Sequence, residues 1–391
     1  MAKFLWLNWS GGGNLPPSLG IARALTERGH RVDFAGRPEM VSRVEAAGFR
    51  PIELTQAYAQ AGRYPAGPMQ RAASYLTSPA VADQLRDVVK AEAPDGVIVD
   101  GMFPAALAQA KDFGKPAAVV SHTFCFRMIE RWRGTTNALS GMRQQAGFGA
   151  LPDLDTLWRS CDRIIVTTLA EFDHATPAGW DSVRHVGPVL EDEKVAVPID
   201  LPWRADDPTP LALMSFSTAP EQRSLDKFQR TLDGLADLPL HVVATTAGVV
   251  DAAELKVPRN VHLVAYAAHD PIIARAALVV THGGHGTAMR ALKHGVPMIV
   301  IPGLGHDQAL IGALMEEWGA GIALPGDATF GAAAGGNAGP SRESMVEALR
   351  VAAQKILATS SYRESAQKRA AMLAGVDGAA NAADEIESLL S

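Results

Sequence analysis

Short apolar runs alternate along the chain with longer amphipathic stretches. The apolar run at residues 4–8, for example, leads through a glycine-rich turn to an amphipathic stretch over residues 19–28, which ends at Gly29. Runs of this length are typical of buried strands, and the amphipathic stretches predict helices. Strands joined by helices form parallel sheets covered on both faces, so the pattern predicts a doubly wound α/β protein. The predicted strands cover residues 4–8, 31–35, 96–99, 117–120, 163–166, 211–216, 241–245, 278–281 and 298–301.

A proline-rich segment between Val186 and Pro210 divides the chain, and its composition is typical of an exposed linker. A length of 391 residues also fits two domains. We therefore predict an N-terminal domain over residues 1–195, a linker over 196–210 and a C-terminal domain over 211–375. We expect residues 376–391 to form a helix that packs back on the N-terminal domain.

Charge and cysteine content narrow the function classes. The chain has 36 Lys and Arg against 42 Asp and Glu, a net charge of −6, so it lacks the basic field that attracts nucleic acid or an anionic membrane. Its two cysteines cannot build a disulfide scaffold or a cysteine zinc cluster. We find no leader pattern and no apolar stretch of about 18 residues. These features predict a cytoplasmic protein, a monomer or homodimer, without nucleic-acid partners or stable membrane insertion.

The segment after the strand at 278–281 carries the most specific chemistry. His282 to Thr287 form a glycine-rich turn at the start of a predicted helix, where free backbone N–H groups can bind a phosphate. Glycine turns between a strand and a helix also occur for purely structural reasons. Asp307 and Gln308 follow the next strand, so they lie at the same sheet edge and suit sugar hydroxyls. The combination favours a phosphate site at the turn, with groups nearby that suit sugar hydroxyls.

The segment HGGHGTAMRALKHGVPMIVIPGLGHDQ, residues 282–308, resembles the donor-binding signature of inverting glycosyltransferases. These enzymes use nucleotide-diphosphate sugars and have the GT-B fold, and the similarity is greatest to bacterial enzymes that glycosylate natural products, including antibiotics. Residues 20–32, 95–120 and 245–281 extend the resemblance over nearly the whole chain. The resemblance implies two Rossmann-like domains facing a cleft, a nucleotide-sugar co-substrate and neither a metal ion nor another cofactor.

The resemblance implies a role for each donor residue. His282 and Thr287, with the backbone at Gly283, Gly284 and Gly286, would hold the diphosphate. Asp307 and Gln308 would hold the sugar, and Tyr266 with Ala267 would hold the base. Ser217 and Thr218 would face the phosphates, although they could equally form a simple turn. Arg290 stands where many relatives have a glutamate for the ribose hydroxyls, which favours a dTDP-sugar over a UDP-sugar.

The catalytic positions depart from the family pattern. Relatives carry a histidine base where this chain has Asn14, and an amide cannot accept a proton at neutral pH. The acid that orients this base in relatives is still present as Asp100. Asp100 could itself act as the base, or His122, after the following strand, could replace the missing imidazole. Alternatively, the acceptor needs little deprotonation.

The acceptor would bind the N-terminal domain. Aromatic and long apolar residues there could line a pocket for a flat aromatic or polyketide-like molecule, or could simply fill the core. We therefore predict a hexosyltransferase that takes a sugar from dTDP or UDP. A non-catalytic nucleotide-sugar-binding partner protein is the alternative, and a GT-B epimerase is a more distant one. The candidate acceptor residues are Trp9, Phe103, Phe124, Phe126, Met128 and Trp132.

Overall fold

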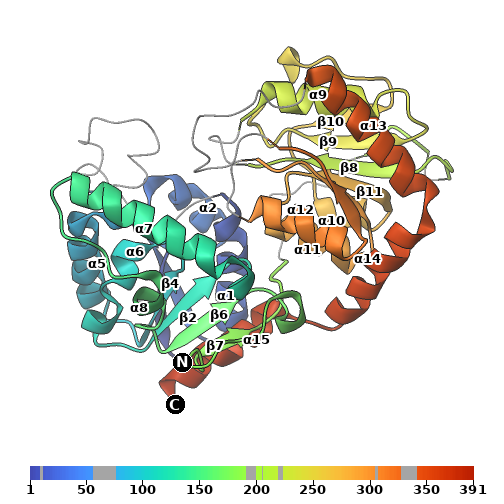
Figure 1. Ribbon diagram of the computed structural model, residues 1–391. Coiled ribbons are helices and arrows are strands. Elements are labelled where there is room, and N and C mark those ends of the chain that lie inside the picture. Colours follow the sequence, from blue (N-terminus) through green and yellow to red (C-terminus); the bar gives the residue numbers. More distant parts are fainter. Residues whose placement is uncertain are drawn as a thin grey trace. The chain divides into compact units, whose positions relative to one another are not determined.

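The chain divides into two compact units in the computed structural model (Figure 1). Unit 1 comprises Met1–Lys194 and Val376–Ser391, and unit 2 comprises Val195–Gly375. Each unit is built around its own parallel sheet. The structure describes residues 1–8, 12–55, 76–190, 200–204, 206–218, 223–303, 307–326 and 341–391.

Unit 1 contains a seven-stranded sheet in the order β3-β2-β1-β4-β5-β6-β7, with every pair parallel. The chain builds outward from β1 to β3 and then returns to the other side of β1 with β4. This reversal creates a switch point between β1 and β4, where open parallel sheets bind ligands. The strands are β1 Lys3–Leu7, β2 Arg31–Gly36, β3 Arg50–Glu53, β4 Gly96–Asp100, β5 Ala117–Ser121, β6 Arg163–Val166 and β7 Val183–His185.

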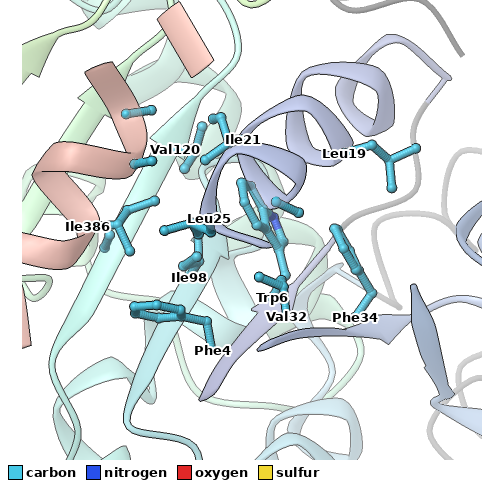
Figure 2. Close-up of a cluster of buried hydrophobic side chains, with 14 of the residues drawn as sticks. Phe4, Trp6, Leu19, Ile21, Leu25, Val32, Phe34, Ile98, Val120 and Ile386 are labelled. Carbon is cyan, nitrogen blue, oxygen red and sulfur yellow. The ribbon is translucent and has the colours of Figure 1, made fainter. Parts of the chain in front are cut away.

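Helices cover the unit 1 sheet and bury its apolar residues. Trp6 and Phe34, on neighbouring strands, stack with ring centroids 5.6 Å apart in the core (Figure 2). The C-terminal helix α15 belongs to this unit, and its Ile386 is buried in the same core as Leu25 (Figure 2). Residues 376–391 thus complete the core of unit 1. The helices are α1 Leu15–Glu27, α2 Val41–Ala46, α5 Pro79–Glu92, α6 Pro104–Leu107, α7 Ile129–Gln145, α8 Leu154–Trp158 and α15 Gly378–Glu387.

Unit 2 repeats this plan with a six-stranded parallel sheet in the order β10-β9-β8-β11-β12-β13. Its switch point lies between β8 and β11. Helices α9 and α13 pack against one another and cover one face of the sheet. The strands are β8 Leu211–Ser215, β9 His241–Thr245, β10 Val261–Val264, β11 Ala276–Thr281, β12 Met298–Val300 and β13 Gly321–Ala323. The helices are α9 Leu225–Leu235, α10 His269–Ile273, α11 His285–Lys293, α12 Gln308–Glu317, α13 Arg342–Ala358 and α14 Ser360–Leu373.

The doubly wound α/β prediction is confirmed, and all nine predicted strands are present within one or two residues of the expected bounds. The strands that the pattern did not predict are β3, β7, β10 and β13. All four lie at sheet edges, and each has residues that are partly exposed. Edge strands do not need a continuous apolar run, because neighbours cover them on one side only. None of the described helices has the length and apolar character needed to cross a membrane.

Candidate active site

The three catalytic candidates of unit 1 converge at its switch point. Asn14 precedes α1, which the chain enters soon after β1, Asp100 ends β4, and His122 directly follows β5. Because β1, β4 and β5 are neighbours in a parallel sheet, their carboxyl ends lie along one edge. The topology therefore gathers residues that are far apart in the sequence.

The Asp100 carboxylate is the centre of this group and is fully buried. The side-chain amide of Asn14 donates to its Oδ2 at 3.2 Å, and the backbone N–H of Met102 donates to its Oδ1 at 2.8 Å. His122 Nε2 lies 3.3 Å from Oδ2, and only 7% of the His122 side chain is exposed. A carboxylate held by several donors can fix the orientation and tautomer of a neighbouring imidazole.

A second set of hydrogen bonds fixes Asn14 itself. The Ser18 hydroxyl donates to the backbone carbonyl of Asn14 at 2.9 Å, and the buried Asn8 amide donates to the Ser18 hydroxyl at 3.0 Å. Pro16 lies in the first turn of α1, and its ring fixes φ near the helical value. Proline has no backbone N–H, and this costs nothing here because the first N–H groups of a helix have no partner within the helix. The start of α1 is thus tied to the end of β1, which holds the Asn14 amide toward Asp100.

The described acceptor candidates are all buried in unit 1. Phe103 and Phe124 have no exposed surface, so in this structure they offer packing rather than a contact surface. Phe126 packs edge-on against Trp180 with ring centroids 5.5 Å apart, and the Trp132 indole donates to the carbonyl of Phe124 at 3.3 Å. Met128 is also buried. Trp9 lies outside the described residues.

Sequence reasoning missed Asp173, which holds the segment that carries several of these residues. Its buried carboxylate accepts hydrogen bonds from the backbone N–H groups of Cys125, Phe126 and Arg127 at 2.8, 3.1 and 2.7 Å. Burial raises the pKa of Asp173, but hydrogen bonds from His185 and from the backbone N–H groups of Arg127, Cys125 and His174 outweigh it, and the pKa lies below its ordinary value. The loop after β5 is therefore shaped by a distant carboxylate, for which the local sequence gives no signal.

In unit 2, two glycines shape the turn after β11. Gly283 has a φ of +85°, and a Cβ there would lie 2.8 Å from the backbone oxygen of Gln308. A Cβ on Gly284 would lie 2.7 Å from Nε2 of His282. The His282 ring therefore packs directly against Gly284, the residue that caps α11. Gly283 requires glycine because of its positive φ and the backbone beside it, whereas a side chain at Gly284 would displace the His282 ring.

The donor candidates of this turn meet at the amino end of α11. His282 comes directly before the turn, and Gly286 and Thr287 belong to the first turn of the helix. The free N–H groups and the positive dipole end of a helix favour an anion here. Burial, and after it the charge of Lys227, lowers the pKa of His282 to about 3. The imidazole is consequently neutral at pH 7, and it can donate a hydrogen bond but contributes no charge.

Asp307 and Gln308 begin α12 at the same sheet edge, after β12. Gln308 is buried, and its side-chain Oε1 accepts the backbone N–H of Gly303 at 2.6 Å. Asp307 is half-buried. Gln308 thus fixes the exit from β12, while Asp307 retains exposed surface that a hydroxyl-rich ligand can reach.

The candidates for the base and the phosphate turn are the most exposed. Tyr266 is 62% exposed, and its hydroxyl donates to the carbonyl of Ala247 at 2.7 Å. This bond fixes an aromatic face toward solvent, next to the half-buried Ala267. Ser217 and Thr218 follow β8, the central strand beside the switch point, and both have exposed surface.

A polar cluster that the sequence did not predict lies beside β8 and β9. The Thr245 hydroxyl is 3.0 Å from the Ser215 hydroxyl and 3.3 Å from Nε2 of His269. Burial and the charge of Arg290 lower the pKa of His269 to about 4. Arg290 is itself buried, with Nε 3.5 Å from Asp270. Arg290, the residue that favours a dTDP-sugar over a UDP-sugar, therefore lies beside the carboxylate of Asp270 in α10.

Metal ligands do not cluster in the described parts of the chain, where no three His, Cys, Asp or Glu side chains are grouped to hold an ion. His285 and His294 lie in or next to α11, and Nε2 of His294 is 3.0 Å from the Asp270 carboxylate. The groups gathered in these two units are hydrogen-bond donors, a buried carboxylate and neutral imidazoles. They suit anion binding and proton transfer.

Comparison with known proteins agrees with this chemistry. Residues 229–388 match the family described as erythromycin biosynthesis protein CIII-like, C-terminal domain. The chain is 24% identical over 440 residues to demethyllactenocin mycarosyltransferase of Streptomyces fradiae, covering 100% of this chain and 87% of that protein.

Two solved structures illustrate the similarity in fold. The calicheamicin glycosyltransferase CalG4 has a TM-score of 0.74 at 22% identity, with 100% of this chain and 98% of that chain covered. The glycosyltransferase VinC, in complex with dTDP, has a TM-score of 0.72 at 17% identity, with 99% of each chain covered. Relatives and fold lead to one conclusion: the chain has the GT-B fold, and it is similar to glycosyltransferases that act in natural-product biosynthesis in bacteria.

Proposed function

We propose that this protein transfers a sugar, with inversion, from a dTDP- or UDP-sugar to a small aromatic or polyketide-like natural product. The observation that carries the proposal is the His282–Gly284 turn at the amino end of α11, beside the switch point of unit 2. This turn offers backbone N–H groups, an imidazole and the Thr287 hydroxyl to a diphosphate. The dTDP in the VinC complex, and the mycarosyl group in the name of the mycarosyltransferase, support a nucleotide-sugar donor.

In this mechanism unit 2 binds the donor and stabilises its leaving group. The anomeric carbon loses its bond to the diphosphate oxygen as the bond to the acceptor forms on the opposite side. Negative charge then develops on the diphosphate, where the helix end and the donors of the turn are already oriented. Tyr266 and Ala267 would hold the base, Ser217 and Thr218 would approach the phosphates, and Asp307 and Gln308 would contact the sugar.

Unit 1 would bind the acceptor and remove its proton. Asp100 accepts hydrogen bonds from Asn14 and Met102 and is fully buried, which suits it to orient a neighbouring base. With Nε2 of His122 facing Asp100, Nδ1 would carry the free lone pair that accepts the proton. Asn14, in the place of the family's histidine, would hold the carboxylate in position. The loop fixed by Asp173 would carry the acceptor-facing segment.

A binding assay and a transfer assay together test the proposal. Titration calorimetry should detect association with dTDP or UDP, and His282→Glu should abolish it by placing a negative charge at the diphosphate. His174→Glu is the control, because this exposed histidine lies in unit 1. Mass spectrometry of mixtures with dTDP- and UDP-sugars and a panel of aromatic and polyketide aglycones should detect a glycosylated product.

The assays also separate the non-catalytic alternative. Nucleotide binding without turnover on any acceptor of the panel would favour a partner protein that has lost its base with Asn14. Absence of binding to both nucleotides, or undiminished binding by His282→Glu, would refute the donor site itself.

A further inference from the structure

A lysine is buried in α9, at a position that apolar residues normally occupy. The buried face of this helix includes Lys227, Phe228, Thr231, Leu232 and Leu235, which repeat with helical spacing. Lys227 is only 3% exposed, whereas lysines are almost never fully buried unless a partner compensates the charge. The position of this lysine in the apolar stripe of a helix can also be seen in the sequence alone.

The ammonium group of Lys227 lies beside the turn that follows β8. Its Nζ is 5.4 Å from the centroid of the Phe216 ring, and Phe216 packs edge-on against Phe228 at 6.0 Å. Phe216 is the residue directly before Ser217 and Thr218. The positive charge of Lys227 therefore lies beside the turn at Ser217 and Thr218, which we assign to the phosphates.

The same ammonium group is also close to the second turn of the donor site. Ser215 pairs with Thr281 in the sheet, so Phe216 and His282 follow directly on neighbouring strands. After burial, the charge of Lys227 is the next cause of the lowered pKa of His282, and this lowered pKa leaves the imidazole neutral. The turns after β8 and β11 thus share one buried cation, while His282 can supply only a hydrogen bond.

Three arginines around α9 form ion pairs with exposed acids. Arg230 lies 3.1 Å from Asp226 in the same helix, and Arg342 of α13 lies 2.7 Å from Asp233. Arg223, just before the helix, lies 2.6 Å from Glu254. The carboxylates of these ion pairs are exposed, and Lys227 lies on the buried face of the same helix.

We propose that Lys227 is a donor-binding residue whose ammonium group compensates the negative charge of the nucleotide diphosphate between the turns after β8 and β11. The inference rests on the proposed function, since it assigns the charge in that same donor site. Its physical basis is that a buried cation gains most from an anion that shares its water-poor surroundings. The proposal adds to the donor site a residue that the resemblance did not supply.

Titration calorimetry of the full-length chain with dTDP and with thymidine tests the proposal, with UDP and uridine run in parallel. Lys227→Met keeps the apolar stem and removes the charge. We expect it to weaken dTDP binding by about 10- to 100-fold, typical for loss of a charged hydrogen bond, and to change thymidine binding by less than about twofold. Lys227→Gln should behave alike, and Lys227→Arg should retain most of the affinity. Lys256→Met, at an exposed lysine of the same unit, is the matched control.

The outcomes are distinct. If Lys227 only supports the Phe216 ring, both variants will lose dTDP and thymidine affinity by the same factor, which would overturn the proposal. Wild-type dTDP affinity in Lys227→Met or in Lys227→Gln would also overturn it. If the wild-type chain binds neither dTDP nor UDP, the proposed function fails, and the role of Lys227 fails with it. The folded state of each variant is checked by circular dichroism before titration.

Discussion

The side-chain amide of Asn14 donates to both oxygens of the Asp100 carboxylate, at 3.2 and 3.5 Å. The residue that replaces the family's histidine thus still contacts the acid, but as a neutral donor. An amide in this position can hold the carboxylate and cannot accept a proton from it or from a substrate. In the proposed mechanism, the catalytic work is therefore distributed differently among Asn14, Asp100 and His122.

Asn14→Ala should consequently have a smaller effect than Asp100→Asn. Loss of one neutral hydrogen bond is worth about 1 kcal/mol, so we expect kcat to fall by roughly fivefold in Asn14→Ala. Loss of the carboxylate that orients the base should reduce kcat by about 10²- to 10⁴-fold. Steady-state transfer kinetics measure both, and Asp112→Asn, at an exposed aspartate, is the control. Equal losses in the two variants would contradict this division of roles.

His122→Gln tests the base directly. If Nδ1 of His122 takes the acceptor proton, the variant should lose about 10²- to 10⁴-fold in kcat. The affinity for dTDP should remain unchanged, because unit 2 binds the nucleotide. Steady-state transfer rates and titration calorimetry with dTDP, measured for the variant and the wild type, provide this comparison. Full activity in both His122→Gln and Asp100→Asn would remove both residues from the mechanism.

Gly284→Ala should disturb the donor site without changing backbone conformation. The φ of −63° at this position is open to alanine, but the added methyl would stand 2.7 Å from Nε2 of His282. The ring must then move, and we expect dTDP affinity to fall by about tenfold, the equivalent of one hydrogen bond to a charged group. Gly141→Ala in α7 is the matched control, since a methyl group there would have no neighbouring atom within 4 Å. Titration calorimetry would refute the prediction if both variants bound equally well.

Asp173→Asn should destabilise unit 1 in a pH-dependent manner. The folded-state pKa of Asp173 lies below its ordinary value, so the charged form stabilises the fold above the unfolded-state pKa. This contribution disappears as pH falls through the folded pKa. We expect a loss of about 1–3 kcal/mol at pH 7 that shrinks below about pH 4. Urea unfolding at several pH values measures it, with the exposed Asp181→Asn as control; a loss that is constant with pH would contradict the assignment.

The last helix should contribute directly to the stability of unit 1. Ile386 of α15 is buried in the core formed by α1 and the strands (Figure 2), and Nε2 of His30 lies 2.6 Å from Glu387. Ile386→Ala should therefore cost about 2–5 kcal/mol, the usual range for a buried isoleucine. Leu390→Ala, at a residue that is 37% exposed, should cost less than half as much. Denaturant unfolding followed by the fluorescence of unit 1 tryptophans compares the two, and equal losses would show that α15 does not complete the core.

The sequence by itself determined the parallel α/β architecture and most of the donor turn. Buried central strands must be apolar on both faces, so β1, β4, β8 and β11 appear as continuous runs, and the glycines at 283 and 284 stand where any side chain would collide. The edge strands β3, β7, β10 and β13 were not predicted. Each of them is partly exposed, so its sequence does not need the continuous apolar run that marks a central strand.

Only the tertiary structure decided which polar groups meet. The order of strands brings Asn14 and His122 to the Asp100 carboxylate, and the inward face of α9 brings Lys227 to the turns after β8 and β11. Asp173 likewise reaches Cys125 across 48 residues. Such contacts depend on register and on distances between elements, whereas hydrophobic periodicity records only which face of each element is buried.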